Sequence, residues 1–272
     1  GNAVETIFHD DKAVGRKWSR NGTTFVMLQN IYGNPQSVDR YSETCDMFDR
    51  AQEILQQENL SFKNVLRTWI YLANILDWYD EFNRARNARF AEFGLLEKSE
   101  KDKRKAEHIY LPASTGILGE NPFGASGTMD ILAMPKDQQN VSIAHTSGIE
   151  QKSPYRYGSA FSRAMTLREA DVTHILLSGT ASIDDHGKTV FLDDTAEQIR
   201  KTLTVVQALI KDEGASLQHI NEATIFFKSA KDYFHYQQVA NDFGNIDLPA
   251  IFIVADVCRD DLLFEIDAAI AF

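Results

Sequence analysis

An internal repeat constrains this chain more than any other feature of its sequence. Residues 61–72 and 216–227 align at a constant offset of 155, which pairs Ile70 with Ile225. Both blocks end in an apolar run rich in β-branched and aromatic residues, and such a run predicts a buried strand. We therefore expect the chain to fold as two similar halves.

The segments that flank the two blocks repeat as well. A helical pattern of apolar residues precedes each block and a second one follows it, which predicts helices over residues 46–55, 78–93, 199–210 and 233–243. Further strand-like segments lie at residues 24–32, 129–133, 174–182, 251–254 and 262–270. Each half thus predicts two helices on one face of a mixed sheet. We expect an α+β fold of two tandem domains, residues 1–136 and 137–272.

Composition and charge exclude several classes of protein. The 272 residues are 43% hydrophobic and 25% charged, which is typical of a globular chain. A net charge of −11 disfavours electrostatic binding to nucleic acid or to an anionic membrane. No apolar run approaches the roughly 20 residues of a transmembrane helix. We expect neither nucleic acid nor a membrane as a partner.

The cysteines and histidines indicate no metal site. Cys45 and Cys258 are too far apart for a metal-binding pair and too few for a disulfide scaffold, so we expect a reducing, cytoplasmic location. The seven histidines lack ligand spacing, and no GxGxxG or Walker motif occurs. The first residues are neither basic nor apolar, so no signal peptide is expected.

Residues 152–165 are the first candidate for a functional segment. They place Arg156, Tyr157 and Arg163 among hydroxyl and aromatic side chains in an otherwise acidic chain. The planar guanidinium group matches the geometry of a carboxylate, so the segment is a candidate anion-binding loop. The alternative is a surface connection whose tyrosines pack on the core.

Residues 255–269 are the second candidate. Strand alternation places Glu265 and Asp267 on one face and Phe264 and Ile266 on the other. A carboxyl group beside apolar neighbours has its pKa raised by desolvation and can act as a general acid. The alternative is an edge strand with a solvated acidic face. Cys258 lies just before this strand.

The second half resembles the YjgF/RidA family of small-molecule-binding trimers, which includes the endoribonuclease L-PSP-like proteins. The segments that carry this resemblance are residues 177–184, 193–199, 214–217 and 263–269. The first half is a more divergent copy. The resemblance implies two tandem RidA-like (chorismate-mutase-like) domains and a homotrimer.

The tandem arrangement is most similar to the chorismatases, which release pyruvate from chorismate. This closer resemblance rests on residues 67–72, 81–86, 111–117, 157–164 and 256–265. It implies a hydrolase that acts on chorismate or a related enol-ether dicarboxylate, a small anionic metabolite as partner, and no metal or organic cofactor.

The same resemblance suggests roles for individual residues. Placing a proton on the enolpyruvyl methylene needs a protonated carboxylic acid, which we assign to Glu265. The substrate carboxylates need cations, and the candidate substrate-binding residues are Arg156, Arg163, Tyr157 and Arg259. In the resembling family, a cysteine at the position of Cys258 accompanies formation of a hydroxybenzoate. We therefore count Cys258 among the catalytic residues and expect 3-hydroxybenzoate as product.

One departure from the family pattern bears on the alternatives. Imine-hydrolysing RidA proteins hold the substrate carboxylate with an arginine directly after a Pro-Ala pair. Here Ser114 follows the first such pair and Ile251 follows the second. A RidA-type enamine/imine deaminase is therefore an alternative hypothesis with less support. A non-catalytic protein that binds a small metabolite is the other alternative.

Overall fold

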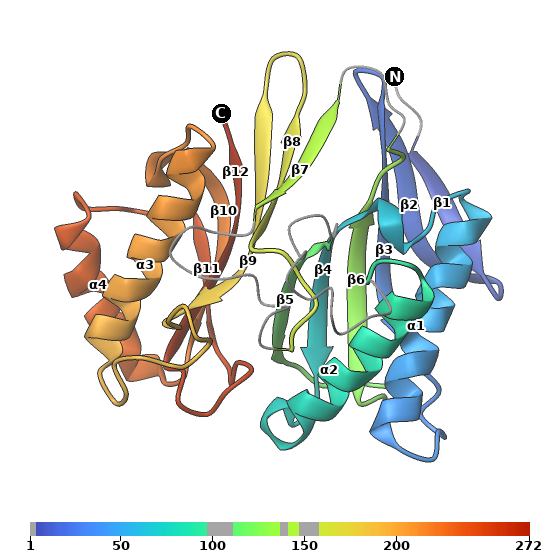
Figure 1. Ribbon diagram of the computed structural model, residues 1–272, viewed down its shortest axis with the longest axis horizontal. Coiled ribbons are helices and arrows are strands. Elements are labelled where there is room, and N and C mark those ends of the chain that lie inside the picture. Colours follow the sequence, from blue (N-terminus) through green and yellow to red (C-terminus); the bar gives the residue numbers. More distant parts are fainter. Residues whose placement is uncertain (1–3, 97–110, 137–140, 147–157) are drawn as a thin grey trace.

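Two six-stranded mixed sheets build the fold, one from each half of the chain (Figure 1). The computed structural model describes residues 4–96, 111–136, 141–146 and 158–272. Each sheet carries helices on one face, which confirms the expected α+β fold of two tandem units. The exact boundary between residues 136 and 137 stays a prediction, because residue 137 lies outside the described residues.

The first sheet has the strand order β1-β2-β3-β6-β4-β5. Its described elements are β1 (Val4–His9), β2 (Lys12–Arg20), β3 (Thr23–Tyr32), α1 (Arg40–Gln57), β4 (Val65–Leu72), α2 (Ile75–Glu92), β5 (Ala113–Leu118) and β6 (Gly127–Ala133). Strands β4 and β5 are parallel, and β4 is antiparallel to β6.

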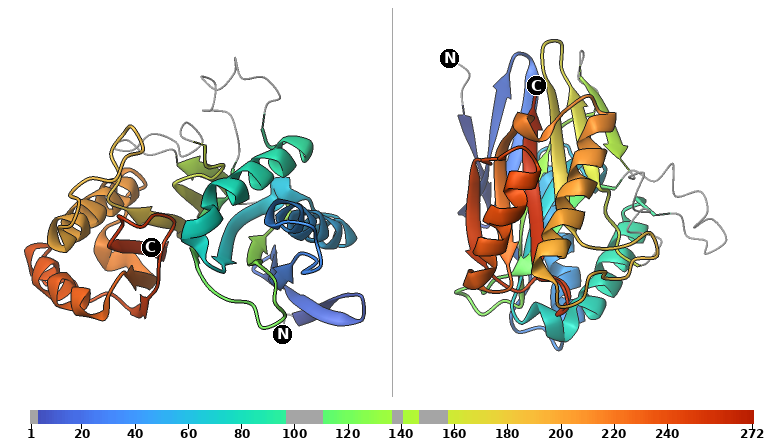
Figure 2. Two further views of the ribbon diagram at one scale, coloured as in Figure 1. Left: turned by 90° about the horizontal axis from the view of Figure 1, so that it is seen from below. Right: turned by 90° about the vertical axis from the view of Figure 1, so that its left-hand side faces the viewer.

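The second sheet has the equivalent order β7-β8-β9-β12-β10-β11. Its described elements are β7 (Ser142–Thr146), β8 (Ala164–Arg168), β9 (Thr173–Ala181), α3 (Thr195–Asp212), β10 (Ile220–Phe227), α4 (Tyr233–Asp242), β11 (Ala250–Val254) and β12 (Phe264–Ala271). In the right-hand view of Figure 2, α3 and α4 lie in front of this sheet.

The repeat predicted from the sequence is confirmed at the level of single residues. β4 and β10 begin and end at positions that differ by 155, and a short 3-10 turn started by Ser61 or Ser216 precedes each strand. The four expected helices all form. None of the helices in the described residues is long and apolar enough to cross a membrane.

Two helices begin earlier than their apolar spacing predicts because of capping. The side chain of Asp39 accepts a hydrogen bond from the backbone N–H of Ser42, and Asp194 does the same for Glu197. An aspartate in this position satisfies one of the free N–H groups at a helix start. The caps therefore add polar first turns to α1 and α3 that carry no apolar pattern.

The two sheets meet where β5 of the first half lies against β9 of the second (Figure 1). The backbone N–H of Ser114 donates to Ser178 Oγ at 2.9 Å, and that hydroxyl donates to the carbonyl of Ser162 at 2.6 Å. Buried apolar side chains continue the contact; they are Leu66, Ala113, Met134, Met165 and Leu167. The edge strand of the first sheet is thus covered by the second half.

The equivalent edge strand of the second sheet, β11, is open within the described chain. Its side chains from Ile251 to Val254 are all exposed, and all four are apolar. Apolar patches of this kind on a folded protein mark a surface that another chain or ligand covers.

We expect the protein to be a homotrimer in solution, because each half keeps a sheet face or edge that its own helices leave bare. Closed cyclic symmetry is the common way to cover such surfaces. Light scattering at micromolar concentration should give three times the chain mass of 30.7 kDa. A mass equal to one chain would contradict this expectation.

Candidate active site

A buried carboxyl group, Glu265, lies where the two halves meet. On β12 the side chains of Phe264 and Ile266 enter the core beneath α3 and α4, whereas Glu265 and Asp267 point away from those helices. Glu265 is 4% exposed and Asp267 is 5% exposed. The predicted alternation is therefore confirmed. β12 lies between β10 and β9, so it is not a solvated edge strand.

Gly179 on β9 provides the space for this carboxyl group. A Cβ atom at position 179 would lie 2.2 Å from Glu265 Oε1. The backbone N–H of Gly179 donates to Thr115 Oγ1 of the first half at 3.1 Å. The carboxyl group of Glu265 is thus seated against a glycine whose own position depends on the opposite half.

Burial makes Glu265 a weak acid. Desolvation is the main cause, and the charge of Asp267 adds to it; together they raise the pKa of Glu265 to about 8. The guanidinium groups of Arg163 and Arg67 act in the opposite direction and lower that pKa. The carboxyl group is mostly protonated at neutral pH, which is the state a proton donor needs.

Buried arginines surround the carboxyl group. The guanidinium carbon of Arg86, from α2, lies 5.2 Å from the centre of the Phe82 ring and 5.6 Å from that of Phe161. The guanidinium carbon of Arg163 lies 6.0 Å from the same Phe161 ring. A stacked guanidinium group keeps its charge and its planar donor edge, so this region suits an anion.

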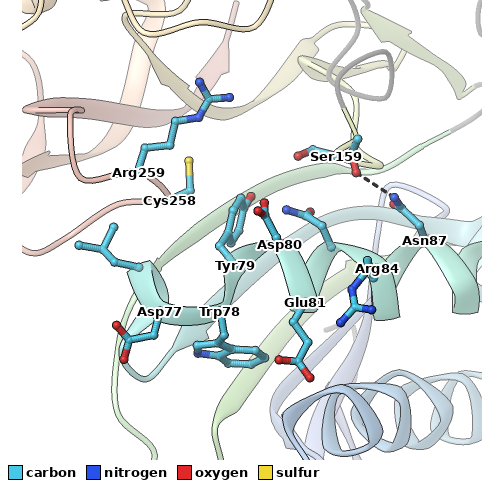
Figure 3. A pocket seen from close by; sticks show the side chains of 13 residues that line it. Asp77, Trp78, Tyr79, Asp80, Glu81, Arg84, Asn87, Ser159, Cys258 and Arg259 are labelled. Atoms are coloured by element: carbon cyan, nitrogen blue, oxygen red, sulfur yellow. Dashed lines mark hydrogen bonds between the residues drawn. The ribbon is translucent and has the colours of Figure 1, made fainter.

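Glu265 lines an inner cavity, and an outer cleft shares Tyr79 and Cys258 with that cavity. The inner cavity, of about 30 Å³, is lined by Tyr79, Arg86, Ser114, Gly116, Phe161, Gly179, Cys258 and Glu265. The outer cleft, of about 770 Å³, is lined by residues 76–81, 83, 84, 87, 158, 159, 258 and 259 (Figure 3). The inner space has room for about two waters. The outer cleft has the volume of a small-molecule site.

The thiol of Cys258 is a weak acid. Burial, followed by the charge of Glu265, raises the pKa of Cys258 to about 12. A thiol with such a pKa stays neutral and is a poor nucleophile at neutral pH. Cys258 therefore lines both cavities as a neutral thiol.

The structure brings some of the predicted site residues together and not others. Glu265 and Cys258 line the inner cavity, and Arg259 lines the outer cleft while its Nη1 donates to the carbonyl of Gly187 at 2.6 Å. Arg163 is buried near Glu265 but is not among the described residues that line either cavity. Arg156 and Tyr157 lie outside the described residues.

Six residues of the inner cavity were not predicted as site residues, and Tyr79 and Arg86 of α2 are two of them. Arg86 lies four positions after Phe82 and four before Phe90, on the buried face of α2. An arginine on an apolar helix face is unusual, because burying a charge is costly unless it has a function or a partner. The position of Arg86 among apolar residues at helical spacing could therefore have identified it as a site residue from the sequence.

Fold and site together define a tandem α+β protein with a protonated carboxyl group and buried arginines between its halves. Residues 158–272 match the family described as Endoribonuclease L-PSP. This match agrees with the family resemblance expected from the sequence for the second half.

Two further comparisons cover nearly the whole chain. It is 24% identical over 279 residues to a 3-hydroxybenzoate synthase of Streptomyces hygroscopicus, and the alignment covers 92% of this chain and 77% of the relative. The crystal structure of a chorismatase superposes with a TM-score of 0.67 at 19% identity, covering 98% of this chain and 85% of the other. The tandem fold is thus shared with a chorismatase.

Replacing Gly179 with alanine should displace the Glu265 carboxyl group and destabilise the protein. The added Cβ overlaps a buried oxygen, and overpacking of this kind costs about 1–3 kcal/mol. Gly116→Ala is the matched control, because its Cβ would meet the Tyr79 ring at an ordinary 3.5 Å. Urea unfolding at pH 7 compares the two variants. Equal stability would show that Gly179 is not the seat of Glu265.

The stability of the protein should depend on Glu265 in a defined pH range. The folded pKa of about 8 lies above the ordinary value of 4.5, so the unfolded chain releases this proton earlier as pH rises. The stability of the wild type should therefore fall relative to Glu265→Gln between about pH 4.5 and pH 8, by a few kcal/mol in order of magnitude, and level off above.

Urea unfolding of both proteins from pH 5 to pH 9 measures this difference. Glu53→Gln, an exposed position on α1, is the control and should track the wild type. A pH-independent gap between the wild type and Glu265→Gln would contradict the assigned pKa.

Proposed function

We propose that the protein is a chorismatase-like enzyme that releases pyruvate from chorismate or a closely related enol-ether dicarboxylate. The observation that carries this proposal is the Glu265 carboxyl group, buried and largely neutral at pH 7, beside Arg86 in the inner cavity. The names of the two whole-chain relatives, a 3-hydroxybenzoate synthase and a chorismatase, support the same reaction.

An enol ether is cleaved by acid, and Glu265 supplies that acid. The proton of the Glu265 carboxyl group passes to the methylene carbon, and the adjacent carbon becomes an oxocarbenium ion. The positive charge then lies close to the new Glu265 carboxylate and to Asp267. Two routes lead on from this ion. In the hydrolytic route, water adds to that carbon and the resulting hemiketal collapses to pyruvate and a dihydrodiol, with one water consumed.

The cations around the site match a dicarboxylate. Arg86 faces the inner cavity and is the best placed to hold the carboxylate of the enolpyruvyl group. Arg259 lies in the outer cleft, where the ring and its carboxylate have room. Arg163 lies over the ring of Phe161, which lines the inner cavity. Arg156 and Tyr157 stay predicted substrate-binding residues. No metal or organic cofactor takes part in this scheme.

The proposed aromatic product is 3-hydroxybenzoate. Chorismate contains the atoms of one 3-hydroxybenzoate and one pyruvate, so this second route needs no net water. The ring loses its hydroxyl group and one hydrogen as it becomes aromatic, and the oxygen of that hydroxyl group takes the place of the added water. Cys258 supports it, because it lines the inner cavity and because, in the family that the chain resembles, a cysteine at this position accompanies formation of a hydroxybenzoate. The proposed assembly is a homotrimer, in which β11 is covered by another chain.

The deaminase alternative finds less support in the residues after the two Pro-Ala pairs. Neither residue can replace the arginine that holds the substrate carboxylate: Ser114 has no charge, and Ile251 is an apolar residue, 64% exposed on β11.

One set of assays separates the hypotheses: pyruvate release from chorismate, ammonia release from an enamine generated from an amino acid, and calorimetric binding of chorismate. Binding without turnover would identify a non-catalytic metabolite-binding protein.

Glu265→Gln should lower the rate of pyruvate release from chorismate by about 100-fold or more, since general acid catalysis contributes 10²–10⁴. The exchange is nearly isosteric but removes the proton. A coupled lactate dehydrogenase assay measures the rate, and Glu53→Gln should match the wild type. If Glu265→Gln keeps more than a few per cent of the activity, Glu265 is not the proton donor.

A further inference from the structure

Arg67 connects the two halves of the chain at the site, although it belongs to the first half. It lies on β4 and is 2% exposed. Its Nη2 is 3.0 Å from Asp267 Oδ2 on β12, and its Nη1 donates to the carbonyl of Leu177 on β9. The guanidinium carbon lies 4.7 Å from the centre of the Trp69 ring. The side chain thus reaches out of one sheet and ends in the other.

The same guanidinium group fixes the wall against which Glu265 is seated. Nη2 of Arg67 donates to Thr115 Oγ1 at 2.8 Å, and that oxygen also accepts the backbone N–H of Gly179 at 3.1 Å. Gly179 is the residue whose missing side chain leaves room for Glu265 Oε1. Two residues, Thr115 and Gly179, therefore lie between Arg67 and the carboxyl group, and Arg67 does not line either described cavity.

Arg67 also balances the charge that most directly opposes ionisation of Glu265. Asp267 lies two residues along β12 on the same face, and its negative charge raises the pKa of Glu265. The other groups that face Glu265 are Arg163 before β8, Arg86 and Tyr79 from α2, and Cys258 from the loop before β12. Three charged groups shift the pKa of Glu265: Asp267, Arg163 and Arg67. Asp267 is the anion among them, and Arg67 is its ion-pair partner.

The repeat allows the site to be compared with the equivalent positions of the first half, where the acid is absent. Strand pairing places Tyr71 opposite Thr128 and Phe226 opposite Glu265, so Thr128 is the first-half equivalent of the acid. By the same register, Asp130 is the equivalent of Asp267. Asp130 is therefore a matched control: the same residue type, in the same sheet position, in the other half.

We infer that Arg67 is a positioning residue for Glu265: through its ion pair with Asp267 and its hydrogen bond to Thr115, the first half holds the acid of the second half in place and allows it to give up its proton. This inference rests on the proposed function for the role of Glu265 as an acid. The contacts themselves do not depend on the identity of the substrate.

The test measures the protonation of Glu265 directly, without substrate. Infrared difference spectra between each protein and its Glu265→Gln counterpart follow the carboxyl band through a pH titration of the full-length chain. The wild type should titrate at about 8. Arg67→Gln should move the midpoint up by about one pH unit or more, because the charge of Asp267 is then unbalanced.

Two further variants keep the test decisive if Arg67→Gln fails to fold. Asp267→Asn should move the midpoint down, because the opposing charge is removed while Arg67 stays. The double variant Arg67→Gln with Asp267→Asn should return the midpoint toward the wild-type value. Asp130→Asn should leave it unchanged. An unchanged midpoint in Asp267→Asn, or one that moves equally in Asp130→Asn, overturns the inference.

Turnover separates this inference from the proposed function. Where chorismate is a substrate, the pH at which pyruvate release declines should shift in the same direction as the infrared midpoint in each variant. Shifted midpoints in a protein that releases no pyruvate support the positioning by Arg67 and reject the proposed function. Pyruvate release by the wild type with unmoved midpoints in Asp267→Asn rejects the positioning and leaves the proposed function intact.

Discussion

The buried ion pair between Arg67 and Asp267 is the interaction on which the arrangement of the site depends. Removing two charges from water costs several kcal/mol per ion, and such a pair adds little stability compared with apolar residues of similar volume. Its hydrogen bonds to the carbonyl of Leu177 and the hydroxyl of Thr115 recover part of that cost. The value of the pair therefore lies in the charge and the geometry that it brings to Glu265.

Duplication explains why one chain holds a single acid of this kind in its described residues. A site between two units needs the acid from one and the supporting arginines from the other, here Glu265 from the second half and Arg67 and Arg86 from the first. The equivalent position in the first half is free to change, and Thr128 occupies it. The covered strand β5 and the open strand β11 reflect the same asymmetry.

Most of the fold could be predicted from local patterns, whereas only part of the site could. The 155-residue offset located β4 and β10, and alternation along β12 placed Glu265 opposite the core. The helix starts shifted because a capping aspartate carries no apolar signal. Arg67 could be recognised in the sequence as a charged residue within a predicted buried strand. Its partner Asp267 is 200 positions away, and the pairing depends on how the two sheets dock. No local pattern contains that information.

Docking also resolves an apparent conflict, since an acid that must stay protonated lies among arginines that favour its anion. Asp267 offsets the charge of Arg67, and Arg163 and Arg86 are further cations near Glu265. In the proposed reaction, the substrate carboxylates neutralise these cations on binding, which favours the protonated form of Glu265. The positive charge that develops on the substrate then favours the carboxylate. The proton is thus held until the methylene carbon is in place and released as the oxocarbenium ion forms.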